Sequence, residues 1–127
     1  MNTIKNTFVT DKTLTAPVLF LIFNRPETTQ QVFSAIKKAK PPRLYVAADG
    51  PRSDYPYESE GCEIVRSIAT NVDWDCEVKT LFRETNLGCG LAVTSAIDWF
   101  FEQESEGIIL EDDTTQAFRN SLRPKYR

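Results

Sequence analysis

Histidine is absent from this chain of 127 residues, and cysteine is sparse. Without histidine, neither a Ser-His-Asp nor a Cys-His catalytic group can form, and the usual zinc sites are excluded. The cysteines (Cys62, Cys76 and Cys89) are odd in number and lack a Cys-x-x-Cys spacing, which indicates reduced thiols in a cytoplasmic protein. Carboxylates, arginine and lysine are therefore left to carry any chemistry.

Long apolar runs are missing as well. The longest run, Val18–Phe23, is far too short to cross a bilayer, and Met1–Ala16 lacks the basic start and apolar middle of a signal peptide. We therefore expect no transmembrane or targeting segment. Basic residues are also scarce up to Asp113, because that part holds all 18 acidic residues and only 11 basic ones. Such an acidic body argues against binding to nucleic acid.

The chain divides into three expected parts. Residues 1–15 are polar and are expected to form a flexible lead-in. Residues 16–113 are enough for one domain with a core and too few for two. Residues 114–127 form a basic tail with four cationic side chains and no acid, and we expect this tail to be solvated, although contact with an acidic partner is the other interpretation.

Four apolar segments alternate with three helical patterns. Strands are expected at Pro17–Phe23, Leu44–Ala48, Glu77–Phe82 and from Gly107 onward, and helices at about 26–38, 60–70 and 91–103. The first helix is expected to begin after a cap at Asn24, since Pro26 suits a first helical turn. Strands separated by helices throughout predict an α/β fold with a parallel sheet.

Polar side chains follow three of the four expected strands. Asn24 and Arg25 follow the first, Asp49 follows the second, and three carboxylates, Glu111–Asp113, follow the fourth. Ligands of parallel sheets bind at this edge, so we expect a site here. Three adjacent carboxylates repel one another in a dry site, and Mg²⁺ or Mn²⁺ held with substrate phosphates relieves them. The alternative is a strand that ends in a solvated acidic turn.

Arg25 and Asp49 each allow two interpretations. Arg25 could hold a phosphate or stack on a base, or it could form a surface ion pair. Asp49 could accept a hydrogen bond from a nucleobase, or it could simply form the turn before Gly50 and Pro51. No pair of a nucleophile and a base accompanies them, which favours a metal-bound diphosphate over hydrolysis by a catalytic triad.

Four short motifs together resemble the nucleotide half of a GT-A glycosyltransferase. They are Asn24-Arg25-Pro26, Ala48-Asp49-Gly50, Asn86-Leu87-Gly88 before a helix, and Ile109-Leu110-Glu111-Asp112-Asp113. The acidic motif is most similar to that of N-acetylglucosaminyltransferase I and its bacterial, hemolytic-protein-like relatives. The similarity covers about Pro17–Asp113 and implies a three-layer, Rossmann-like fold with a mostly parallel sheet.

The resemblance also implies a site for a nucleotide sugar of the UDP type. Its residues would be Asn24, Arg25, Asp49, Asn86, Gly88, Glu111 and Asp112, with Asp113 as the direct ligand of Mn²⁺ or Mg²⁺. Asp49 would read a uracil-type base, Arg25 would lie beside the base or diphosphate, and Glu111 and Asp112 would contact the ribose and sugar. Glycosyl transfer to the hydroxyl of an unidentified acceptor would follow, with the metal stabilising the departing diphosphate. No catalytic residue is assigned.

The family continues past its acidic motif with further strands, an acceptor site and, in inverting members, a catalytic carboxylate. Only residues 114–127 follow here, without an apolar strand or an acid. We therefore expect a truncated transferase that is inactive by itself, binds nucleotide weakly and self-associates through an open sheet edge. A non-catalytic nucleotide-binding or assembly fragment is the alternative. Receiver-like domains and haloacid-dehalogenase-type phosphatases are disfavoured, because both need acidic residues where Asn24 and Arg25 stand.

Overall fold

The computed structural model describes residues 14–112 of the chain. Seven elements follow one another in the predicted order: β1 (Val18–Ile22), α1 (Pro26–Ala39), β2 (Arg43–Ala48), α2 (Glu58–Ala69), β3 (Glu77–Phe82), α3 (Cys89–Phe101) and β4 (Ile108–Glu111). The predicted metal ligand Asp113, the basic tail and most of the predicted lead-in lie outside the described range. The predicted alternation of strands and helices is confirmed.

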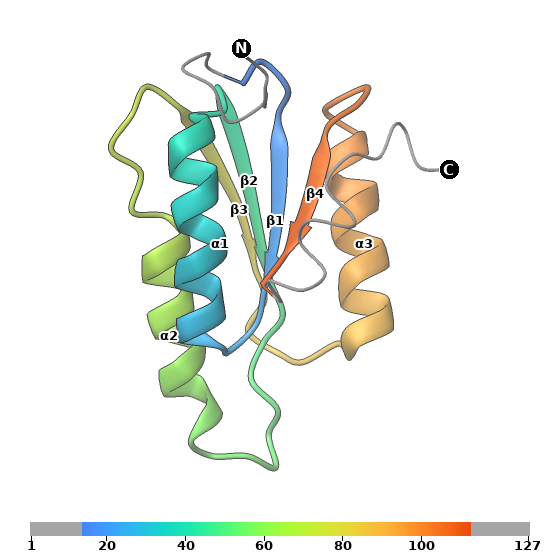
Figure 1. Ribbon diagram of the computed structural model, residues 1–127. Coiled ribbons are helices and arrows are strands. Elements are labelled where there is room, and N and C mark those ends of the chain that lie inside the picture. Colours follow the sequence, from blue (N-terminus) through green and yellow to red (C-terminus); the bar gives the residue numbers. More distant parts are fainter. Residues whose placement is uncertain (1–13, 113–127) are drawn as a thin grey trace.

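All four strands are parallel, and their order in the sheet is β3-β2-β1-β4. β1 is central, since Val18 lies opposite Leu44 of β2 on one side and Ile108 of β4 on the other. The carboxyl ends of the strands therefore lie at one edge of the sheet, at the bottom of Figure 1. The predicted parallel α/β architecture is confirmed.

Helices cover both faces of the sheet. α1 and α2 pack on one face and α3 packs on the other, which gives three layers (Figure 1). Successive side chains of β1 divide between these faces: Phe20 belongs to the core beneath α1 and α2, while Leu19 and Leu21 belong to the core beneath α3. Burial on both faces explains why β1 is apolar at every position, and a fully buried side chain such as Phe20 contributes roughly 2–3 kcal/mol.

The start of α1 differs from the prediction. Asn24 does not cap the helix; the N-cap residue is Arg25, and no side chain caps the free amides. The Nδ2 of Asn24 instead donates to Oε2 of the buried Glu58 at 3.0 Å. A charged acceptor with little access to water is a stronger partner for the Asn24 amide than a solvated helix terminus. The change matters for the site because it joins the end of β1 to the start of α2.

A polar cluster joins α3 to β2 at the opposite end of the sheet. Glu104, just after α3, accepts hydrogen bonds from Nε and Nη2 of Arg43 at 2.6 and 2.9 Å. It also accepts one from the hydroxyl of the buried Tyr45 at 2.6 Å. The Arg43 guanidinium lowers the pKa of Glu104, whereas burial and the bond to Glu104 raise the pKa of Tyr45 to about 12. This cluster fixes the end of α3 far from the carboxyl edge of the sheet.

None of the helices within residues 14–112 is long and apolar enough to cross a membrane.

Candidate functional site

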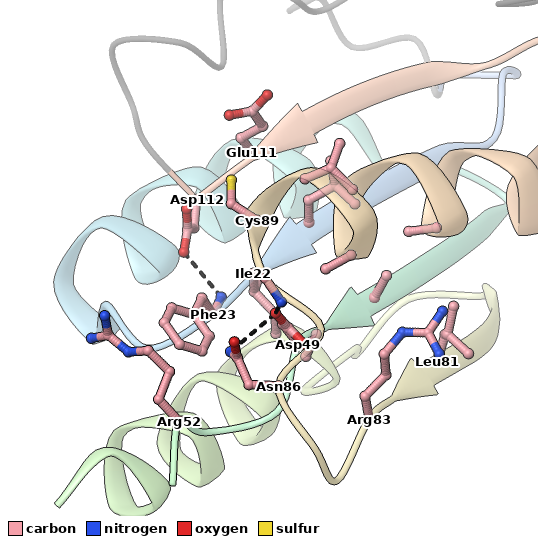
Figure 2. A pocket seen from close by; sticks show the side chains of 17 residues that line it. Ile22, Phe23, Asp49, Arg52, Leu81, Arg83, Asn86, Cys89, Glu111 and Asp112 are labelled. Atoms are coloured by element: carbon pink, nitrogen blue, oxygen red, sulfur yellow. Dashed lines mark hydrogen bonds between the residues drawn. The ribbon is translucent and has the colours of Figure 1, made fainter. Parts of the chain in front are cut away.

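A cavity of about 430 Å³ opens at the carboxyl edge of the sheet, on the side covered by α3 (Figure 2). Its walls include small side chains from β2 and α3, among them Ala47, Ala92 and Ala96. Larger apolar side chains such as Leu81 and Val93 also line it, together with six polar ones: Asp49, Arg52, Arg83, Asn86, Glu111 and Asp112. We call it the sheet-end cavity. Because these alanine side chains are small, the cavity has room for a ligand, and the surrounding charged groups can orient it.

The sheet-end cavity lies where the order of the chain reverses in the sheet. β1 connects to β2 through α1 on one face, whereas β4 is reached through α3 on the other face. The carboxyl ends of β1 and β4 lie side by side at this point, and Phe23 and Asp112, which directly follow these strands, line the cavity. Such switch points are the usual ligand positions in open α/β sheets. The topology therefore accounts for a cavity at this edge.

Asp49, directly after β2, holds the loop that leads into α3. Its Oδ1 accepts hydrogen bonds from the backbone N–H groups of Gly50 and Leu87, both at 2.8 Å. Its Oδ2 accepts from the Gly88 N–H and from Nδ2 of Asn86, both at 3.1 Å. Nδ2 of Asn86 also donates to the Gly50 carbonyl at 2.7 Å. One carboxylate thus engages four donors, which matches its full accepting capacity.

Two glycines make this loop geometry attainable. A Cβ on Gly50 would lie 2.6 Å from the carbonyl carbon of Thr85 and 2.7 Å from that of Glu84, so the two backbones can approach only because Gly50 has no side chain. Gly88 has φ +90°, a value that residues with a side chain rarely adopt. Gly88 and Cys89 then line the cavity at the first turn of α3, where no side chain caps the helix.

The two described carboxylates of the acidic motif point in different directions. Oδ2 of Asp112 accepts a hydrogen bond from the Phe23 N–H at 3.1 Å, which links the end of β4 to the end of β1. Figure 2 shows the Glu111 carboxylate directed away from that of Asp112. Burial raises the pKa of Asp112, although the Phe23 N–H and the positive charge of Arg25 oppose the rise. Both carboxylates line the sheet-end cavity, and Asp112 in addition holds the end of β4 against β1.

The oxygen donors of the acidic motif suit a metal ion, but the predicted direct ligand, Asp113, lies outside the described range. Within residues 14–112, no group of three or more His, Cys, Asp and Glu side chains converges as a metal cage. A Mg²⁺ or Mn²⁺ ion held together with substrate phosphates needs only one or two carboxylates. Glu111 and Asp112 are hard oxygen donors next to the predicted ligand Asp113, so the chemistry of the motif suits such an ion.

Three arginines that the sequence reasoning did not single out shape the rim. Arg83, after β3, lines the cavity and donates through Nη2 to Oγ of Ser95 at 3.0 Å. Arg66 of α2 donates to the backbone carbonyls of Arg83 and Asp49, at 2.8 and 3.2 Å. Arg66 therefore ties the ends of β2 and β3 together.

Arg52, three residues after Asp49, is held more tightly. It pairs with Glu58 through Nε and Nη2, and its guanidinium lies 3.9 Å from the ring centroid of Tyr55 and 5.9 Å from that of Phe23. The hydrogen bonds from the Arg52 guanidinium lower the pKa of Glu58, and Glu58 in turn raises the pKa of Arg52. The only sequence signal for Arg52 was its place in the loop after Asp49, with a carboxylate six positions later.

Five of the seven residues predicted for the site line the sheet-end cavity: Asp49, Asn86, Gly88, Glu111 and Asp112. Asn24 and Arg25 do not line it. Asn24 is engaged with Glu58, and Arg25 is an exposed residue whose charge acts on Asp112. The structure therefore brings these five residues together at one edge of the sheet, and the binding role of each residue stays a prediction.

Comparison of the chain with protein-family models, with curated proteins and with solved structures finds no match in any of the three. The residues of the cavity are therefore the basis for a functional proposal.

Proposed function

We propose that the sheet-end cavity binds the nucleoside diphosphate part of a UDP-type nucleotide sugar, and that the chain is the donor-binding part of a GT-A-like glycosyltransferase. The observation that carries the proposal is the position of the cavity, at the switch point between β1 and β4, with arginines and carboxylates around it. The order of short motifs along the chain supports the same interpretation.

Phosphate binding is supported by the groups on the α3 side of the cavity. The first turn of α3 presents backbone N–H groups that no side chain caps, and the positive end of the helix dipole lies there. Arg83 lines the same cavity and uses Nη2 on Ser95, which leaves other guanidinium N–H groups for an anion. Together these groups would orient a diphosphate without moving the backbone.

The carboxylate oxygens with which Asp49 would recognise a base already accept hydrogen bonds from the loop before α3. Both carboxylate oxygens already accept two hydrogen bonds each from Gly50 and from residues 86–88. A uracil N–H would therefore have to displace one of these donors. Asn86 also lines the cavity and offers an amide oxygen as a further acceptor for the base.

The acidic motif is proposed to hold the metal. Asp113 would be the ligand of Mn²⁺ or Mg²⁺, with Glu111 and Asp112 beside it. A bound divalent ion supplies electrostatic stabilisation of the departing diphosphate. Asp112 itself would hold the end of β4 against β1 through the Phe23 N–H, so that the strand end stays in place when the ligand binds.

Calorimetric titration of UDP with and without Mn²⁺ tests the proposal. We expect metal-dependent binding that is at least tenfold weaker in Asp113→Ala. Glu106→Ala is the matched control, because it removes one exposed carboxylate before β4, at the other end of the strand. The proposal is wrong if UDP fails to bind in every condition, or if binding is indifferent to both Mn²⁺ and Asp113→Ala.

A non-catalytic nucleotide-binding fragment is the second candidate. It shares the binding behaviour described above, and the donor-binding part of a transferase is itself expected to be inactive alone. Release of UDP from a UDP-sugar when an acceptor is supplied would exclude the second candidate.

A further inference from the structure

The side-chain amide of Asn86, in the loop between β3 and α3, has a fixed orientation. Its Nδ2 donates to Oδ2 of Asp49 at 3.1 Å and to the Gly50 carbonyl at 2.7 Å, which uses both amide hydrogens. Turning the amide over would place its oxygen, Oδ1, against a carboxylate and a carbonyl, which are both acceptors. The protein therefore sets the position of Oδ1 before any ligand binds.

Oδ1 of Asn86 is an acceptor without a donor. No residue between 14 and 112 donates a hydrogen bond to it, although Nδ2 of the same amide makes two. Asn86 is half-buried and lines the sheet-end cavity, and Figure 2 shows its side chain joined to Asp49 there. A half-buried acceptor is more stable with a partner than without one. A ligand that carries an N–H or O–H group can supply this partner.

Asp49 differs from Asn86 in having no oxygen to spare. Its two carboxylate oxygens accept from the backbone N–H groups of Gly50, Leu87 and Gly88 and from the Asn86 amide. A new donor at Asp49 would break one of these bonds, whereas a new donor at Asn86 breaks none. Of these two side chains at the cavity, only Asn86 can therefore recognise a ligand without opening the loop before α3.

The chemistry of this part of the cavity favours a donor over an anion. A phosphate placed beside Oδ1 of Asn86 and the Asp49 carboxylate would bring acceptor atoms and negative charges together. A nucleobase suits the position better, provided that it carries an N–H group on the edge that faces Asn86. Uracil and thymine have such a group at N3. Cytosine has a lone pair at N3 instead, so its N3 would repel the amide oxygen.

We propose that Asn86 selects the base of the nucleotide, with Oδ1 accepting the N3–H of uracil or thymine and rejecting cytosine. Asp49 is a positioning residue in this assignment. It orients the Asn86 amide and keeps its four hydrogen bonds when the base binds, in contrast to the expectation from the sequence motif that Asp49 reads the base. The assignment rests on the proposed function for the presence of a nucleotide.

Calorimetric titration of UDP and CDP in the presence of Mn²⁺ tests the proposal on the full chain. We expect UDP to bind at least tenfold more tightly than CDP, because CDP leaves Oδ1 of Asn86 facing another acceptor. In Asn86→Ala the two affinities should differ by less than twofold. Thr85→Ala is the control and should keep the tenfold ratio, since Thr85 is exposed in the same loop and does not line the cavity.

Two measurements leave the protein unchanged and cover the case in which Asn86→Ala disrupts the loop. The first is titration of 3-methyluridine diphosphate, which has a methyl group in place of the N3 hydrogen and should bind at least tenfold more weakly than UDP. The second is hydrogen exchange at the amides of Leu87 and Gly88. Both amides should stay protected when UDP binds, because Asp49 releases neither of them.

The outcomes separate base selection from nucleotide binding. If UDP and CDP bind equally well to the unchanged chain, or if 3-methyluridine diphosphate binds as tightly as UDP, base selection by Asn86 is wrong and the nucleotide site stands. Faster exchange at Leu87 or Gly88 with bound UDP would also overturn it, because Asp49 would then have given up a donor to the base. Failure of every nucleotide to bind would overturn the proposed function and this assignment together.

Discussion

Replacing Asp49 by alanine removes the acceptor of four hydrogen bonds at the point where β2 ends and the loop before α3 passes over it. Three of the donors belong to residues 86–88, and the fourth is the Gly50 N–H. Each hydrogen bond to a charged group contributes roughly 1.5–3 kcal/mol when water cannot replace it. Because Asp49 is half-buried, water recovers much of this, and we expect a loss of about 2–3 kcal/mol in the free energy of unfolding.

Urea unfolding of the chain and of Asp49→Ala measures that loss, with Asp98→Ala as the control because Asp98 is an exposed carboxylate on α3. Hydrogen exchange adds a local readout. The amides of Leu87 and Gly88 are expected to exchange faster in Asp49→Asn, since the asparagine amide group offers one acceptor oxygen in place of two. Unchanged exchange at both amides, together with an unchanged unfolding midpoint, would refute the assignment of Asp49 as the anchor of this loop.

Three further predictions concern stability. The pKa of Tyr45 is about 12 in the folded chain and 10.0 ordinarily, so the folded chain holds the hydroxyl proton more tightly than the unfolded chain. The free energy of unfolding should therefore fall by about 2–3 kcal/mol between pH 10 and pH 12. Urea unfolding of Tyr45→Phe should not show this fall. Arg43 lowers the pKa of Glu104, so its stabilisation is present above the ordinary pKa and is lost as the pH falls through the folded value; Glu104→Gln should flatten the acid limb of the same stability profile. Gly50→Ala should cost about 1–3 kcal/mol by overpacking, whereas Gly90→Ala, whose added Cβ meets nothing within 4 Å, should leave the thermal midpoint unchanged or higher.

The fold was largely predictable because its strongest signals are local. β1 is buried on both faces, and that burial requires an unbroken apolar run that is visible in the sequence. Pro26 at the start of α1 and the basic residues in its last turn also mark that helix directly. Strand order was less accessible, because nothing in the sequence of β4 states that it pairs with β1 rather than with β3.

The candidate site was predictable only as an edge of the sheet. The carboxyl ends of parallel strands lie at one edge of a sheet, so Asp49 and Asp112 could be expected at the same edge, and both line the cavity there. The partners of each side chain were not predictable. Asn24 bonds Glu58 rather than α1, and Arg52 packs against Tyr55, because these contacts depend on how the loop before α2 folds back. Loop geometry of this kind leaves no periodic signal in the sequence.

The central place of β1 has a consequence for how the chain is made. β1 is synthesised first, but Val18 finds its partner Ile108 only after nearly the whole described chain has emerged from the ribosome. Until then one edge of an entirely apolar strand stays open, and the core beneath α3 is incomplete. Open apolar edges pair readily with other chains, and late closure over such a distance is slow. Nascent chains that end before β4 should therefore depend on chaperones, and release from them should follow the appearance of the last strand.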